Sequence, residues 1–219
     1  RFARLGIRTV LFAGRNEMIQ RLTELLANTS QIAMEYSELG ELPRISKVDA
    51  GTLELVRNLG IQVTSSADTL QYATQRWSLQ QLQSHKVAAG KLGTIVKEAF
   101  EYLGKSPASR RTEIKIAQFI RKRFNEEGLD APDGPIVAAN EHSSDPHFDP
   151  MTSPPREIKN GDWLLIDLWA RLSGKDTMFA DITWTAFIGD QVPKHHQRIF
   201  DIVTGARDEA LSKIKTASE

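Results

Sequence analysis

The chain has 219 residues, of which 28 are Lys or Arg and 28 are Asp or Glu, so its formal net charge is zero. This balance predicts neither nucleic acid nor a membrane as a partner, and no apolar run approaches the roughly 18 residues that a membrane span needs. The absence of cysteine excludes disulfides, thiolate zinc sites and cysteine nucleophiles, and it favours a cytoplasmic location.

Residues 1–76 are predicted to form a small α/β domain. Short β-rich stretches alternate with two amphipathic segments of helical spacing, and these stretches are 8–13, 31–36 and 61–65. Asp49 is the predicted N-cap of the second helix, and Gly60 is its predicted end. The alternation of strands and helices in so short a segment favours parallel pairing of the strands.

Residues 77–219 are predicted to form a second domain of α+β class, because the pattern changes near Trp77. Two amphipathic helices come first, and strands follow before a last helix begins at Pro193. The predicted elements are helices at 78–103 and 114–124, a strand at 135–140 and a hairpin at 163–187.

The predicted hairpin holds a carboxylate in each of two otherwise apolar strands, Asp167 and Asp181. A turn centred on Gly174 would place these residues directly opposite each other on one face of the sheet, with Cβ atoms roughly 5 Å apart. A small shift of the turn would make them near neighbours instead, and only a bulge that reverses one side chain would send the two carboxylates to opposite faces.

Two facing carboxylates repel each other, by about 4 kcal/mol at ~4 Å and an effective dielectric constant near 20. Three arrangements would relieve this repulsion: a shared proton, a separate cationic or backbone partner for each carboxylate, or a divalent cation between the two. Thr183 and Thr185 make the neighbouring positions of the second strand polar without making them cationic. This chemistry favours a hard cation held by oxygen ligands.

The stretch IKNGDWLLIDLWARLSGKDTMFADITWTAFIG, residues 158–189, closely resembles the first metal-binding hairpin of the pita-bread metallopeptidases. That family includes methionine aminopeptidase, prolidase, Xaa-Pro aminopeptidase and creatinase. The resemblance implies that Asp167 chelates one metal and that Asp181 bridges two. The expected cofactors are therefore two divalent ions, with manganese favoured over cobalt, zinc or iron.

Upstream, the stretch IVAANEHSSDPHFDP, residues 136–150, resembles the family's active-site histidine segment. This match implies that His147 contacts substrate and helps to move protons. His142 and Thr183 are the candidates for additional substrate contacts. His195 and His196 lie too early for the family's later ligands and are expected to be solvated. The family's remaining His and Glu ligands are expected in a second half of the fold, beyond this sequence.

The resemblance implies the first half of a pita-bread domain, preceded by the C-terminal part of a creatinase-like N-terminal domain. Such a domain is typical of prolidase-like members, so the expected function is a dinuclear-metal peptidase that cleaves an N-terminal residue from Xaa-Pro peptides through a metal-bridged hydroxide. A short peptide is the expected substrate, and a homodimer is compatible with the family. The alternatives are a metal-free homologue, either a creatinase-like hydrolase or a binding module, and a half-site that is inactive alone.

Overall fold

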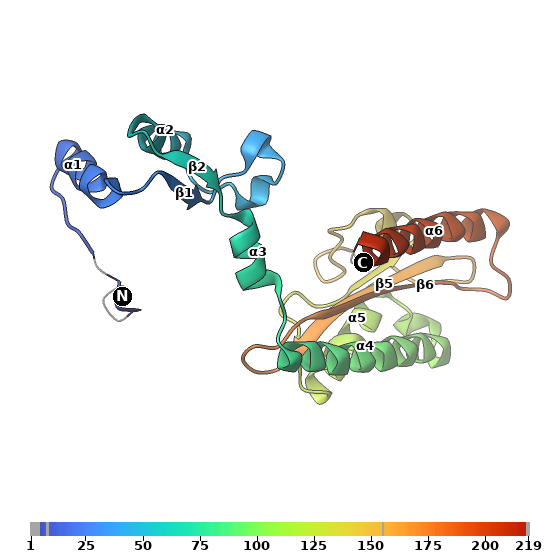
Figure 1. Cartoon of the computed structure of the whole chain (residues 1–219). Helices are drawn as coiled ribbons and strands as arrows, with labels where there is room; N and C mark the ends of the chain where they lie inside the picture. The colour runs from blue at the N-terminus through green and yellow to red at the C-terminus, as the bar shows by residue number, and fades with distance from the viewer. Residues whose placement is uncertain (1–4, 8, 155, 218–219) are drawn as a thin grey trace. The chain divides into compact units, whose positions relative to one another are not determined.

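The computed structural model describes residues 5–7, 9–154 and 156–217. The chain divides into two compact units, Arg1–Arg76 and Trp77–Glu219, which are described separately (Figure 1). In the described part of the chain, no helix is both long enough and apolar enough to cross a membrane.

The first unit is built around two parallel strands, β1 (Gln31–Met34) and β2 (Gln62–Ser65), in which Gln31 pairs with Gln62. Its helices are α1 (Arg15–Leu26), α2 (Ala50–Asn58) and α3 (Ala67–Gln75), with short 3₁₀ turns at Glu38–Gly40 and Pro43–Ile45. As predicted, Asp49 caps α2: its side chain accepts a hydrogen bond of 2.9 Å from the backbone N–H of Thr52.

The predicted first strand is wrong for its described residues, 9–13, which form no strand; Arg8 lies outside the described residues. The sheet therefore has two strands instead of three. The side chains of Leu11 and Phe12 are 87% and 54% exposed. A β-rich sequence becomes a strand only where an edge is available for pairing, and local sequence does not show where such an edge lies.

The second unit contains an antiparallel sheet with β5 (Trp163–Leu172) at its centre. On one side, β5 pairs with β6 (Ala180–Phe187); on the other, it pairs with β4 (Ile136–Ala139) and with the two-residue strand β3 (Leu129–Asp130). The predicted hairpin and the predicted strand at 135–140 are thus confirmed.

Two helices pack along one side of this sheet, α4 (Leu79–Lys105) and α5 (Glu113–Glu126) (Figure 1). Ser78 and Gln81 form a reciprocal capping box that begins α4. Alternate residues of β5 are fully buried against the helices, because successive side chains of a strand point to opposite faces. The largest aliphatic side chains that are fully buried in this core are Leu92, Ile95, Ile116, Ile120, Leu164, Ile166 and Leu168.

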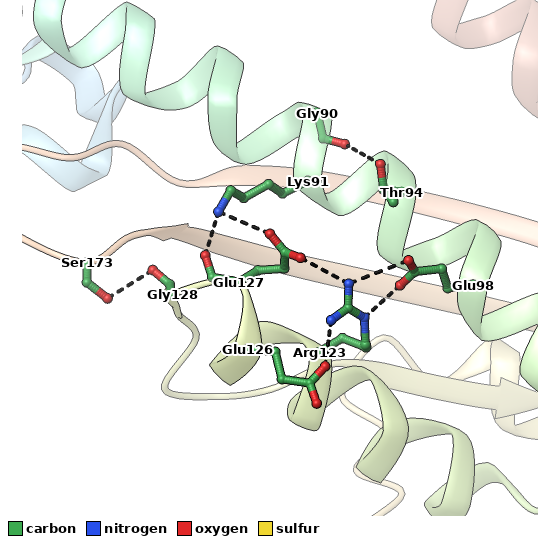
Figure 2. A network of polar contacts seen from close by, with 9 residues as sticks. All are labelled: Gly90, Lys91, Thr94, Glu98, Arg123, Glu126, Glu127, Gly128 and Ser173. Atoms are coloured by element: carbon green, nitrogen blue, oxygen red, sulfur yellow. Dashed lines mark hydrogen bonds and ion pairs between the residues drawn. The ribbon is translucent and has the colours of Figure 1, made fainter.

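A network of charged side chains closes the edge between α4 and α5 (Figure 2). The guanidinium of Arg123 on α5 donates to Glu98 on α4 at 2.7 Å and to Glu127 at 3.0 Å. Lys91 on α4 forms an ion pair of 3.2 Å with the Glu127 carboxylate. Hydrogen bonds to carboxylates, to Glu98 above all, raise the pKa of Arg123, so the hub of this network stays charged.

The last helix, α6 (Lys194–Ala217), follows the hairpin, and none of its described side chains is buried. Its first turn contacts the start of β5, where the rings of His196 and Trp163 stack with centroids 5.0 Å apart. His195 is exposed as expected, whereas His196 is partly covered by this stack.

Candidate metal-binding site

The predicted register of the hairpin is wrong by two residues. Asp167 lies opposite Thr183, and Asp181 lies opposite Trp169, so the two aspartates are diagonal neighbours instead of a directly facing pair. A shift of two residues keeps each side chain on its original face, because the side-chain period of a strand is two. Both carboxylates consequently remain on the same face of the sheet.

Contacts with distant parts of the chain explain this register. The tip of the hairpin is a long loop, which α4 holds: the backbone N–H of Met178 donates to Ser84 at 3.1 Å, and the carbonyl of Phe179 lies 2.8 Å from the ring nitrogen of His85. At the other side, Leu172 pairs with Leu129 of β3. The turn is therefore not a tight one centred on Gly174.

Thr183 holds the first carboxylate of the pair. Its hydroxyl donates a hydrogen bond of 2.7 Å to Oδ1 of Asp167. Among the described residues, no Lys or Arg forms an ion pair with Asp167 or Asp181, although such partners neutralise many other carboxylates of this chain. Of the three arrangements considered for the pair, separate cationic partners are thereby excluded within the described chain.

Burial raises the pKa of Asp181, and the charge of Asp167 and a hydrogen bond with that carboxyl raise it further. The two groups thus resist simultaneous ionisation, as expected of close carboxylates. A shared proton or a divalent cation would each relieve this repulsion. The donor set fits a hard divalent cation, because it consists of carboxylate and hydroxyl oxygens.

A cavity of about 430 Å³ opens beside Asp167 and Thr183. The strands contribute the apolar side chains of Ile136, Ala138 and Leu165, and residues 143–146, which are polar except for Pro146, form the opposite wall. The volume falls within the range of small-ligand pockets, and apolar lining with a few polar groups is their usual character.

The structure places His147 on the loop that follows this wall. Its side chain is exposed, and its backbone N–H donates to the Asp145 carboxylate at 2.9 Å. No hydrogen bond or ring contact within the described chain joins the His147 imidazole to Asp167 or Asp181. The predicted catalytic role of His147 therefore stays a prediction.

His142 is held by a residue that the sequence prediction missed. Its ring nitrogen Nδ1 lies 2.9 and 3.0 Å from the two carboxylate oxygens of Glu113, a buried residue in the first turn of α5. The His142 ring also stacks on Phe148, with centroids 4.3 Å apart. Its position in the sequence indicated that Glu113 would be buried, because it lies four and seven residues before the buried Ala117 and Ile120, on the same face of the helix.

The described residues contain no group of three or more His, Cys, Asp or Glu side chains that could hold a metal. A metal site that included Asp167 and Asp181 would therefore need further ligands from outside the described residues.

The profile of metallopeptidase family M24 matches residues 85–218, which is more than half of the chain. A comparison with curated protein sequences found no match.

Solved structures of peptidases have a similar fold. Prolidase from Thermococcus sibiricus matches 93% of this chain with 52% of its own length, at 18% identity and a TM-score of 0.52. X-Pro aminopeptidase from Thermotoga maritima matches 94% with 53% of its length, at 21% identity and a TM-score of 0.53. Zinc-substituted aminopeptidase P from E. coli, in complex with product, matches 90% with 44% of its length, at 20% identity and a TM-score of 0.53. The chain thus spans about half the length of these proteins.

Proposed function

Since the chain belongs to metallopeptidase family M24, we propose that the complete protein is a dinuclear-metal peptidase that cleaves the N-terminal residue from Xaa-Pro peptides or dipeptides. The observation that carries this proposal is the pair Asp167 and Asp181: two carboxylates on one face of a sheet, beside a cavity, without a Lys or Arg partner in the described chain.

Each residue of the site has a proposed task. Asp167 and Asp181 would hold the divalent cations, while the Thr183 hydroxyl keeps the Asp167 carboxylate in its orientation. When bound, divalent cations would acidify a water molecule and polarise the peptide carbonyl. His147 is the proposed group that transfers a proton near the departing nitrogen. His142 and Thr183 remain the proposed substrate contacts.

The proposed substrate is a short peptide with proline in the second position. Two observations support it: the relatives of similar fold include a prolidase and an X-Pro aminopeptidase, and the cavity beside Asp167 is of small-ligand size. Manganese is the proposed metal, since the two ligands of this chain are oxygen donors. Residues 1–76 are proposed to be part of a creatinase-like N-terminal domain.

A metal-free homologue is the second candidate, either a creatinase-like hydrolase or a binding module. The raised pKa of Asp181 is compatible with it, because a shared proton also relieves the repulsion between the carboxylates.

Metal content separates the two candidates. The full-length protein is loaded with manganese, freed of excess metal and measured by elemental analysis. The dinuclear proposal expects two ions per chain, and a protein that retains none would support the metal-free candidate.

Activity is tested on a proline dipeptide and on a matched dipeptide that carries alanine in place of proline. The full-length protein is expected to cleave the proline substrate preferentially. Residues 1–219 alone are expected to be inactive, because the described residues among them contain no group of three or more possible metal ligands. Robust hydrolysis by residues 1–219 would contradict the proposed ligands.

A homodimer and a cytoplasmic location, with neither nucleic acid nor membrane as a partner, are the remaining parts of the proposal. Light scattering and cell fractionation would test them.

A further inference from the structure

Glu113 is the one buried charged residue in the described part of the chain, with 1% of its surface exposed. It lies in the first turn of α5, among apolar side chains that pack against the sheet. Burying a carboxylate is unfavourable unless hydrogen-bond donors surround it. The groups that donate hydrogen bonds to the Glu113 carboxylate therefore show which parts of the chain it positions.

Both donors come from the start of the segment that walls the cavity. Oε1 of Glu113 accepts a hydrogen bond of 2.6 Å from the backbone N–H of Ala139, the last residue of β4. The carboxylate also faces Nδ1 of His142, in the 3₁₀ turn that follows. The short contacts of Nδ1 with both carboxylate oxygens fix the orientation of the His142 ring, and the tautomer with hydrogen on Nδ1 is the one that donates to a carboxylate.

The backbone around Glu113 holds the far end of the same segment. The N–H of Glu113 donates to the carbonyl of Arg156 at 3.2 Å, and the carbonyl of Arg111 accepts from the N–H of Ile158 at 2.7 Å. The beginning of α5 therefore fastens the chain both where it leaves β4 and where it returns towards β5.

The fastened segment carries the parts of the site that lie opposite the sheet. Residues 143–146 form one wall of the cavity beside Asp167, and His147 comes next in the chain. Phe148 is buried and packs on the His142 ring, which connects the Glu113 contact to the backbone beside His147.

We propose that Glu113 is a positioning residue: through Ala139 and His142, its carboxylate fixes the cavity wall and the backbone beside His147 relative to Asp167. Its consequence for hydrolysis rests on the proposed function. Glu113 itself need not touch substrate or metal, since its carboxylate is already occupied by two donors of the protein.

The test compares Glu113→Gln with Glu98→Gln in the full-length protein. The first change keeps the shape of the side chain and one acceptor but removes the charged, two-oxygen contact with His142. The second removes a carboxylate that pairs with Arg123 at the edge between α4 and α5 (Figure 2). It is the matched control for a general loss of stability.

In Glu113→Gln, amide hydrogen exchange across residues 139–148 is expected to become faster, with metal content unchanged. The value of kcat is expected to fall about 10- to 100-fold, as is typical when an orienting partner is lost, while KM changes much less. Glu98→Gln is expected to leave both exchange in this segment and kcat as in the wild type. A double variant of Glu113→Gln with His142→Gln should lose no more than the worse single variant, because the two residues act together.

The proposal would be overturned if Glu113→Gln had the same amide hydrogen exchange and the same kcat as the wild type. It would also be overturned if kcat fell as much in Glu98→Gln as in Glu113→Gln. If the wild type hydrolyses no peptide, the proposed function fails, and exchange alone decides: faster exchange confined to residues 139–148 supports the positioning role, and unchanged exchange refutes it. If Glu113→Gln does not fold, His142→Gln breaks the same contact from its more exposed side and is judged by the same readouts.

Discussion

The two faces of strand β5 share one backbone and have opposite chemistry. On the face towards α4 and α5, Leu164, Ile166 and Leu168 are fully buried. On the other face, Leu165, Asp167 and Trp169 are all partly exposed, and the Asp167 carboxylate lies beside a cavity.

This difference shows how the sheet separates stability from chemistry. The buried face contributes burial of apolar surface, which makes the sheet a rigid support. The open face can then hold two repelling carboxylates, and burial, followed by the charge of Asp167, raises the pKa of Asp181. Substitutions on the two faces should accordingly affect different measurements.

The largest effect is expected from Asp181→Asn. Losing the proposed bridging carboxylate should lower kcat/KM on a proline dipeptide by more than about 100-fold. Loss of a residue that only hydrogen-bonds to a metal ligand already lowers activity about 10- to 100-fold, and loss of a ligand itself should cost more. The control is Asp176→Asn in the exposed hairpin loop, where φ is 57° and asparagine is well tolerated. Unchanged turnover in Asp181→Asn would remove the bridging role.

Leu168→Ala tests the buried face of the same strand. A fully buried leucine leaves a cavity when it is truncated, so the free energy of unfolding should fall by about 2–5 kcal/mol, measured by urea denaturation of the metal-free protein. Leu165→Ala on the open face should cost less than about 2 kcal/mol. Equal losses at the two positions would contradict the separation of the faces.

Thr183→Val removes the hydroxyl that bonds to Asp167. Activity should fall about 10-fold. If Thr183 orients Asp167, the variant should bind manganese more weakly and have a lower kcat. If Thr183 contacts the substrate, as predicted from the sequence, only KM should rise. Thr185→Val, two residues along the same face and opposite Leu165, is the matched control and should retain wild-type constants.

The smallest effect concerns His196, at the end of the hairpin. Burial, and then the charge of His195, lower the pKa of His196 below its ordinary value. The unfolded chain therefore binds a proton more readily than the folded protein does, so stability is lost as pH falls below about 6.5.

His196→Gln should remove this loss of stability. The fall in Tm between pH 7.5 and pH 5.5 should therefore be smaller in the variant than in the wild type, by at most about 2 °C, because the ring is only partly buried. His195→Gln should remove only the part that is due to charge repulsion. A pH dependence that is unchanged in His196→Gln would exclude the imidazole as its source.

Local patterns were sufficient for most helices and for the hairpin. Asp49 identified the start of one helix, since a cap acts within three residues of its own position. The β-rich stretch 8–13 was misread because pairing depends on a distant strand. The contact between Glu113 and His142 was missed for the same reason, since it joins residues 29 apart in the sequence.

The sequence by itself predicted that Asp167 and Asp181 share a face, and the observed register, two residues away from the predicted one, keeps that face because an even shift leaves both side chains on one side of the sheet. It also determined the amphipathic helices, whose apolar residues repeat with the helical period. Only the tertiary structure decided which residues face each other across the hairpin, because Ser84, His85 and β3 hold its loop from positions far along the chain. It alone decided as well that a buried carboxylate on α5 anchors the cavity wall, since that contact exists only after α5 has packed against the sheet.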